Sequence, residues 1–235
     1  MHMGGGMMET KNISLATILI GMISQKGGVG KSTLSRLVAR EYVKAAWNVK
    51  IADLDVSQGT SFNWQARRLQ NIVEPAIAVE RFGTVDQALK NSLHYDMLIL
   101  DGAPHSTAGT QKIAEVCDLV VLPTGLSLDD MEPSVLLAHE LVKKGVTKTK
   151  IVFALCRVGD SEAEINEARN YLNQAGYEVL KGSLPEKTAY RRASDEGRTL
   201  AETRFSSLND RSDALAQGII DKVTKIQKSK SGKAA

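Results

Sequence analysis

Residues 24–33 of the 235-residue chain read Ser-Gln-Lys-Gly-Gly-Val-Gly-Lys-Ser-Thr, with two lysines five positions apart. The stretch follows the apolar run TILIGMIS and leads into a segment of helical period. Glycines let backbone N–H groups close around phosphate oxygens, and a helix N-terminus adds partial positive charge. The order of strand, glycines, Gly-Lys-Ser and helix therefore predicts a phosphate-binding loop. The expected nucleotide contacts are Gly27, Gly28, Val29, Gly30, Lys31, Ser32 and Thr33.

Within this loop, Lys31 would reach the β- and γ-phosphates and the Ser32 hydroxyl would ligate Mg²⁺. The strict pattern G-x-x-x-x-G-K-[ST] has glycine where this chain has Gln25, and it leaves Lys26 unexplained. With Lys26, the loop resembles the K-G-G-x-G-K-[ST] loop of the deviant Walker A ATPases of the ParA and MinD family. In that family the first lysine crosses a dimer interface to the partner's nucleotide, so the resemblance assigns this role to Lys26. The alternative is an exposed lysine beside a ligand.

Carboxylates stand at the ends of two expected strands. The stretch VKIADLDVSQG contains Asp53 and Asp55, and YDMLILDGAP contains Asp101. The resemblance implies that Asp55 orients the attacking water, that Asp53 supports the Mg²⁺ shell and that Asp101 holds Mg²⁺ through water. The family's D-x-D-P-Q motif is altered here, because Val56-Ser57 replaces its single proline. The alternative role of Asp53 and Asp55 is to cap the following turn.

Two later stretches agree with the same resemblance. In the family, the segment matching DLVVLPTGLSLDD lies beside the γ-phosphate and the dimer face. The segment matching GSLPEKTAYRRASDEGRTL closes over the adenine, which would place Pro185 against the base.

Apolar, β-rich runs alternate with longer segments of helical period, which predicts an α/β fold with a doubly wound, mostly parallel sheet and helices on both faces. Ligands bind beyond the carboxyl ends of the strands in such sheets, so the motifs should gather there. The expected strands are 17–24, 49–53, 76–81, 97–100, 119–122, 151–155 and 178–183. The expected helices are 31–47, 61–69, 85–93, 107–116, 131–144, 162–175, 188–196 and 212–228.

The composition, 43% hydrophobic and 24% charged, fits one sizeable core. We expect a disordered lead-in or expression remnant over 1–14, a single P-loop ATPase domain over 15–228 and a disordered basic tail over 229–235. The two cysteines, Cys117 and Cys156, suggest neither a disulfide framework nor a metal site, which favours a cytoplasmic setting. No apolar run approaches the roughly 20 residues that cross a bilayer.

Positive charge gathers at the C-terminal end. The formal net charge is +3, yet residues 222–235 carry five lysines and no acid, which leaves 3 − 5 = −2 for the rest of the chain. The apolar residues of 212–228 fall on one helical arc suited to a protein core. The lysines point away from it, either as a solvated face or as contacts to the DNA backbone. The residues expected to contact DNA are Arg191, Arg192, Arg198, Lys222, Lys225 and Lys228.

The resemblance covers nearly all of residues 15–227 and is closest to the small ParA proteins of plasmid and chromosome partitioning. It implies an ATPase with ATP and Mg²⁺ as cofactors and an ATP-dependent sandwich homodimer that binds DNA non-specifically at the nucleoid. It also implies a ParB-like centromere-binding partner that stimulates hydrolysis. A membrane-associated, MinD-like positioning ATPase is one alternative, although the C-terminal segment has no Phe, Trp or Leu after position 215. A nucleoid-based positioning ATPase for a protein cargo is the other.

Overall fold

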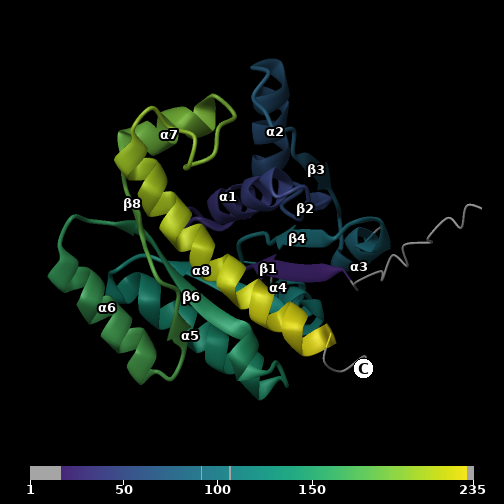
Figure 1. The fold of residues 1–235 in the computed structure, drawn as a ribbon. Coiled ribbons are helices and arrows are strands. Elements are labelled where there is room, and N and C mark those ends of the chain that lie inside the picture. The colour runs from purple at the N-terminus through teal and green to yellow at the C-terminus, as the bar shows by residue number, and fades with distance from the viewer. Residues whose placement is uncertain (1–16, 91, 106, 232–235) are drawn as a thin grey trace, which may run out of the picture.

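Strands and helices alternate along the chain in the computed structural model, which describes residues 17–90, 92–105 and 107–231 (Figure 1). The strands are β1 (Ile18–Met22), β2 (Val49–Asp53), β3 (Ala78–Arg81), β4 (Met97–Asp101), β5 (Leu119–Thr124), β6 (Ile151–Val158), β7 (Glu178–Val179) and β8 (Leu184–Pro185). The α-helices are α1 (Lys31–Lys44), α2 (Thr60–Gln70), α3 (Val85–Leu89), α4 (Thr107–Val116), α5 (Leu128–Lys143), α6 (Glu162–Gln174), α7 (Thr188–Asp195) and α8 (Ser206–Ser231).

The strands form one parallel sheet in the order β3-β2-β4-β1-β5-β6-β7, and β8 pairs with β6. The chain first builds β2 and β3 on one side of β1 and later β5 to β7 on the other, so the strand order reverses at β1. This confirms the expected doubly wound fold. Because the strands are parallel, their carboxyl ends meet at one edge, where Asp53 of β2 and Asp101 of β4 are register partners.

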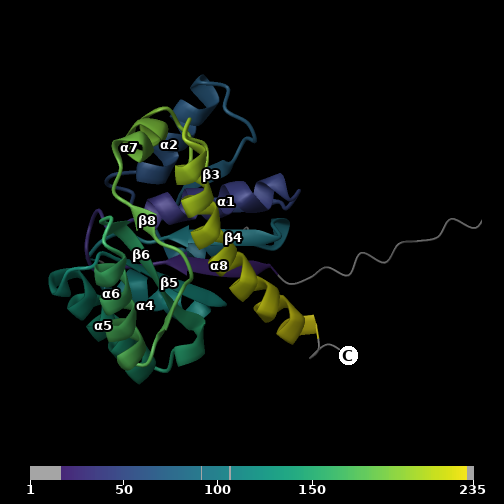
Figure 2. The same ribbon diagram turned by 60° about the vertical axis from the view of Figure 1, so that its left-hand side comes forward.

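Two apolar cores cover the two faces of the sheet. Alternate residues of β4 enter different cores: Met97 and Ile99 pack toward α1, α2, α7 and α8, whereas Leu98 and Leu100 pack toward α3 to α6. This period of two is what a strand buried on both faces requires. Figures 1 and 2 show α8 starting beside α7 and running across the sheet to the opposite end of the molecule.

Most element boundaries lie within four residues of the prediction, and the main differences concern the expected strand 178–183 and the helix expected over 212–228. The expected strand 178–183 ends at Val179 as β7, and β8 begins only at Leu184, after Gly182 has taken a left-handed conformation with φ of 78°. The helix expected over 212–228 begins six residues earlier, at Ser206. It also continues to Ser231, past the expected start of the tail, and Lys230 pairs with Asp118 at 2.8 Å. The lead-in 1–14 and residues 232–235 lie outside the described residues.

Candidate nucleotide-binding site

The loop between β1 and α1 lies at the carboxyl edge of the sheet, at the point where the strand order reverses. Gly28 and Gly30 have φ angles of 73° and 115°, a region that glycine adopts without steric cost. Gly30 is the N-cap of α1, and within the described residues no side chain caps this helix and no acid lies in its first turn. The free N–H groups and the positive end of the helix dipole therefore make the loop a site for phosphate.

Lys31 is folded back into this loop. Its side chain is largely buried, and its Nζ donates to the carbonyl oxygen of Lys26 at 2.9 Å. Burial lowers the pKa of Lys31, while the charges of Asp101 and Asp55 act in the opposite direction. The ammonium group is thus held at the phosphate end of the loop before any ligand binds.

Asp101, the last residue of β4, is 2% exposed. Its Oδ2 accepts a hydrogen bond from Ser61 Oγ at 2.7 Å, and its Oδ1 has no partner among the described residues. Burial raises the pKa of Asp101 to about 6, against the lowering effects of the Ser61 hydrogen bond and the Arg36 charge. A buried carboxylate oxygen without a partner is costly, so this atom is suited to a ligand that arrives with the nucleotide.

Arg36 of α1, which the sequence analysis did not identify, connects this carboxylate to α7. Its Nε donates to Ser61 Oγ and one of its terminal nitrogens donates to Ser194 Oγ, both at 3.2 Å. Burial lowers the pKa of Arg36 to about 10. The sequence did contain a signal for Arg36, because this arginine falls among the apolar, buried residues of the helix that follows the phosphate loop.

Asp53 and Asp55 are engaged in local structure. Asp53 Oδ2 accepts from the backbone N–H groups of Ser61 and Phe62 at 2.9 and 3.0 Å, at the start of α2. Asp55 Oδ1 accepts from Ser57 Oγ at 2.6 Å and from the backbone N–H of Gln58 at 3.2 Å. The turn-capping role is therefore present for both residues. Asp55 is only partly buried and its charge also acts on Lys31, so it still faces the phosphate end of the loop.

The residues at this edge fit a hydrated Mg²⁺. Asp101 offers the free oxygen described above, and Ser32 is near enough to lower the pKa of this carboxyl group. Asp53 is less available, because backbone N–H groups already engage both of its oxygens. No group of three or more His, Cys, Asp or Glu in the described part of the chain could hold a metal by itself. An ion here would thus depend on nucleotide phosphates and water, as Mg²⁺ commonly does.

Lys26 points out of the loop and contacts the start of α5. Its Nζ pairs with Asp130 Oδ1 at 2.9 Å and donates to the Asp129 carbonyl oxygen. Both side chains of the pair are about one third exposed or more, at 40% and 32%. The hydrogen bond from Lys26 lowers the pKa of Asp130. The sequence analysis placed the segment of Asp130 near the γ-phosphate but did not predict this pair.

A cavity of about 370 Å³, which we call the nucleotide cavity, opens beside the phosphate loop. It lies between the end of β6, β8 and α7. Gly30 lines it, and a Cβ at this position would lie 3.3 Å from Cys156 Sγ. The cavity is of a size that can hold a base and ribose. The expected Thr33 and Pro185 line it, together with residues that the sequence analysis did not identify, among them Cys156, Arg157 and Tyr190.

A family model described as the CobQ/CobB/MinD/ParA nucleotide binding domain matches residues 20–200. The chain belongs to this family. The expected ParA and MinD resemblance is thereby confirmed. A sequence comparison with curated proteins gives no significant match.

Solved structures of MinD and partition proteins have the same fold as this MinD/ParA-type domain. The Mg-ADP complex of the septum site-determining protein MinD from Pyrococcus horikoshii has a TM-score of 0.70 at 16% identity, covering 90% of this chain and 98% of that one. An AMPPNP-bound putative plasmid partition protein from Borrelia burgdorferi has a TM-score of 0.65 at 17% identity, covering 88% and 99%. A Cyanothece McdA–ATP complex has a TM-score of 0.66 at 15% identity, covering 87% and 96%.

The arginines expected to contact DNA lie on two sides of α7 in this MinD/ParA-type domain. Arg191 lines the nucleotide cavity and bonds to Glu186 at 3.4 Å and Thr188 Oγ1 at 3.1 Å. Arg192 and Arg198 instead line a second groove on the other side of the helix. The three arginines therefore do not form one surface.

The lysines of α8 also differ from one another. Lys222 pairs with Glu178 and its side chain is only 17% exposed. Lys225 and Lys228 are exposed on the last turns of α8. Of the three, Lys222 is thus the least suited to a DNA contact.

Proposed function

We propose that this chain is a ParA-type ATPase of DNA partitioning. ATP and Mg²⁺ drive a sandwich dimer that binds DNA non-specifically at the nucleoid, and a ParB-like partner stimulates hydrolysis and release. The observation that carries the proposal is Lys26, a second lysine at the mouth of the phosphate loop that points outward while Lys31 fills the loop. An outward lysine at this position can reach the phosphates of a second copy.

The chemistry follows from this arrangement. The N–H groups of the loop and Lys31 hold the β- and γ-phosphates. Ser32 and Asp101 would hold Mg²⁺, which would neutralise the charge of these phosphates. Asp55 orients a water in line with the γ-phosphate. The Lys26 of a second copy adds positive charge where negative charge develops during transfer. Hydrolysis removes the γ-phosphate and with it the attraction that stabilises the dimer.

Two observations favour DNA over a membrane surface as the binding partner. The apolar face of α8 is packed in the core, with Leu215, Ala216, Ile219 and Val223 at most 1% exposed. A membrane-binding helix would instead need this face free. The second observation is the likeness to the Borrelia relative described as a putative plasmid partition protein.

None of the described helices is both long and apolar enough to cross a membrane.

Sedimentation of the full chain with plasmid DNA or with anionic liposomes, each with and without ATP and Mg²⁺, tests the proposal. We expect ATP-dependent sedimentation with DNA only. Lys26→Ala is the matched variant: it should still bind ATP but should neither dimerise in light scattering nor sediment with DNA. Sedimentation with liposomes, or DNA binding that depends on neither ATP nor Lys26, would contradict the proposal.

A further inference from the structure

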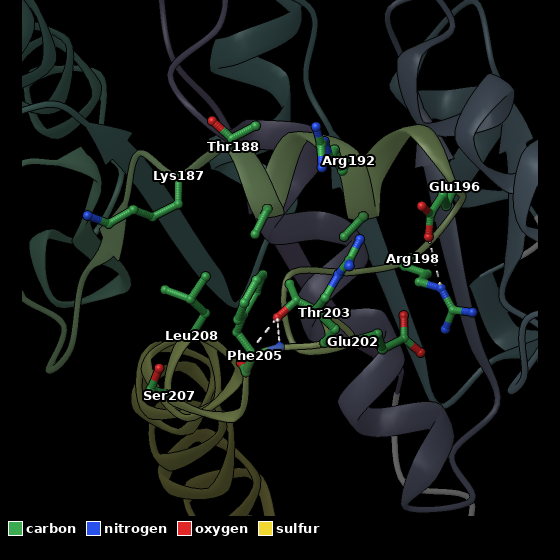
Figure 3. Close-up of a pocket in the computed structure, with 13 residues that line it drawn as sticks. Lys187, Thr188, Arg192, Glu196, Arg198, Glu202, Thr203, Phe205, Ser207 and Leu208 are labelled. Carbon is green, nitrogen blue, oxygen red and sulfur yellow. Dashed lines mark hydrogen bonds and ion pairs between the residues drawn. The ribbon is translucent and has the colours of Figure 1, made fainter.

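A second groove lies on the outer side of α7, away from the nucleotide cavity (Figure 3). Its volume is about 760 Å³, and its walls come from α7, residues 196–205 and the first turn of α8. Ala189, Ala193, Phe205 and Leu208 give it apolar surface. Concave sites of this size hold small organic ligands or single units of a larger chain.

The two acidic side chains of this α7 groove are already engaged. Glu202 accepts hydrogen bonds at 2.8 and 2.9 Å from the fully buried Arg68. Glu196 pairs with Arg198 at 3.4 Å, as the dashed line in Figure 3 marks. Neither acid is therefore a free negative charge in the groove.

Positive charge remains in the α7 groove after these pairs are counted. Arg192 and Arg204 both line it, and neither has an ion-pair partner within the described part of the chain. The Arg204 guanidinium lies 5.9 Å from the centroid of the Phe205 ring. The α7 groove therefore carries uncompensated positive charge beside an aromatic ring.

Phe205 is held in place by a hydrogen-bonded turn. Its backbone N–H donates to Thr203 Oγ1 at 3.1 Å. Asn209 fixes Thr203 in turn, accepting from its backbone N–H at 2.9 Å and donating to its carbonyl oxygen at 3.0 Å. The Phe205 side chain is nonetheless 50% exposed. A half-exposed aromatic ring on a fixed turn can receive a stacked ring without reorganisation.

We infer that the α7 groove is a second binding site for a nucleotide unit, with the base stacked on Phe205 and the phosphate between Arg192 and Arg204. The unit can come from a free nucleotide or from single-stranded nucleic acid, because both present a base face and a phosphate. Paired and stacked bases of a duplex do not present that face, so a duplex would use the two arginines but not Phe205. The inference goes beyond the proposed function and requires neither hydrolysis nor a dimer.

The groove and the nucleotide cavity share α7 as a common wall. Tyr190 lines the nucleotide cavity, and its hydroxyl donates at 2.7 Å to the carbonyl oxygen of Leu208, which lines the groove. A ligand in one site that moves α7 would change the affinity of the other, and linkage makes this effect reciprocal.

Fluorescence anisotropy of the full chain, saturated with Mg-ADP to fill the phosphate loop, tests the inference. The probes are a labelled ten-residue oligothymidylate and a labelled duplex, with free thymidine monophosphate as competitor. Phe205→Ala should weaken binding of the single strand about 5- to 150-fold, the range for loss of one stacked base, and Phe205→Tyr should restore it. Displacement of the strand by thymidine monophosphate identifies the free nucleotide as a sufficient source, and failure to displace identifies the strand.

The double variant Arg192→Ala/Arg204→Ala should lower the slope of log affinity against log salt by roughly 0.7 for the single strand, because the two arginines hold one phosphate. Lys90→Ala/Lys143→Ala removes the same charge from exposed positions beside α3 and on α5, on the opposite face of the sheet, and should change neither quantity. Unchanged single-strand affinity in Phe205→Ala, or equal effects of the two double variants, would overturn the inference. ATP-dependent binding of the duplex in the same variants reports on the proposed function separately.

Discussion

The two sides of the phosphate loop differ in how their charges are held. On one side Lys31 and Asp101 are buried, and Ser61, Arg36 and backbone groups fix their surroundings before any ligand is present. On the other side Lys26 and Asp130 form an exposed pair. A buried charge without its partner is costly, whereas an exposed ion pair contributes little and can exchange. The buried side is therefore suited to holding the nucleotide, and the exposed side to exchanging one partner for another.

The largest expected effect is on the buried side. Lys31→Ala should weaken ATP binding by about 30-fold or more, as expected for loss of one member of a buried charge pair. Titration with a fluorescent ATP analogue measures it. Lys26→Ala removes the same charge five residues away and should leave binding within a few fold of wild type. Equal losses in the two variants would contradict the division into two sides.

Asp55 tests whether a turn-capping residue also acts in hydrolysis. Asp55→Asn keeps an oxygen that can accept from Ser57 and Gln58 but removes the negative charge. If Asp55 orients water, this variant should hydrolyse ATP about 100-fold more slowly while still binding it. Phosphate release under saturating ATP is the measurement. A wild-type rate in Asp55→Asn combined with a slow Asp55→Ala would assign Asp55 to the turn alone.

The raised pKa of Asp101 predicts a gain in stability when its charge is removed. The folded-state pKa of about 6 lies above the ordinary 3.8, so the folded protein binds more protons than the unfolded chain between these values. The nucleotide-free protein therefore loses stability as pH rises through this window. The full loss is at most about 3 kcal/mol, at 1.36 kcal/mol per pKa unit. Asp101→Asn should recover part of this lost stability at pH 7.5. The recovery is only partial because the buried Arg36 loses a nearby negative charge.

Urea unfolding of wild type and Asp101→Asn across this range of pH checks the prediction. The difference in the free energy of unfolding should vanish toward pH 4 and reach its full size above pH 6. Mg²⁺ should also cease to strengthen nucleotide binding in the variant. A difference that does not change with pH would show that the carboxylate carries no burial penalty.

The smallest expected effect is on the exposed side. Asp130→Asn weakens the pair that holds Lys26 against its own subunit, so ATP-dependent dimerisation should become up to about 5-fold tighter, the scale of an exposed ion pair. Analytical ultracentrifugation with ATP measures it. Asp129→Asn is the matched control, because Asp129 contributes only its carbonyl oxygen to Lys26. A weaker dimer in Asp130→Asn would mean that Asp130 supports the interface instead.

The sequence predicted the fold and the loop because both depend on local patterns. The continuous apolar run of β4 and the glycines before α1 specify their structures within a few residues of chain. The pairing of Lys26 with Asp130 joins positions 104 apart, and the chain from Arg36 to Ser194 spans 158. Such contacts depend on how helices pack. A single sequence gives only the residue types for them.

The same limit explains why the sequence analysis did not separate the two arginines of α7. Arg191 and Arg192 are neighbours in sequence, and the sequence analysis gave both one role. One step along a helix turns the side chain by about 100°, so they face different cavities. Period-based reasoning could have separated them if the apolar face of α7, with Tyr190 and Ala193, had been located first.

Cys156 beneath the phosphate loop has a practical consequence for labelling chemistry. Burial raises its pKa to about 12, and the thiol of Cys117, the only other cysteine, is also buried with a raised pKa. Alkylating reagents attack the thiolate, so neither native thiol should compete with an introduced one in the folded protein. The chain should therefore behave as a cysteine-free background, in which Asp129→Cys, an exposed position beside Lys26 that leaves this lysine in place, could carry a cross-linker or a fluorophore to report on subunit approach in real time.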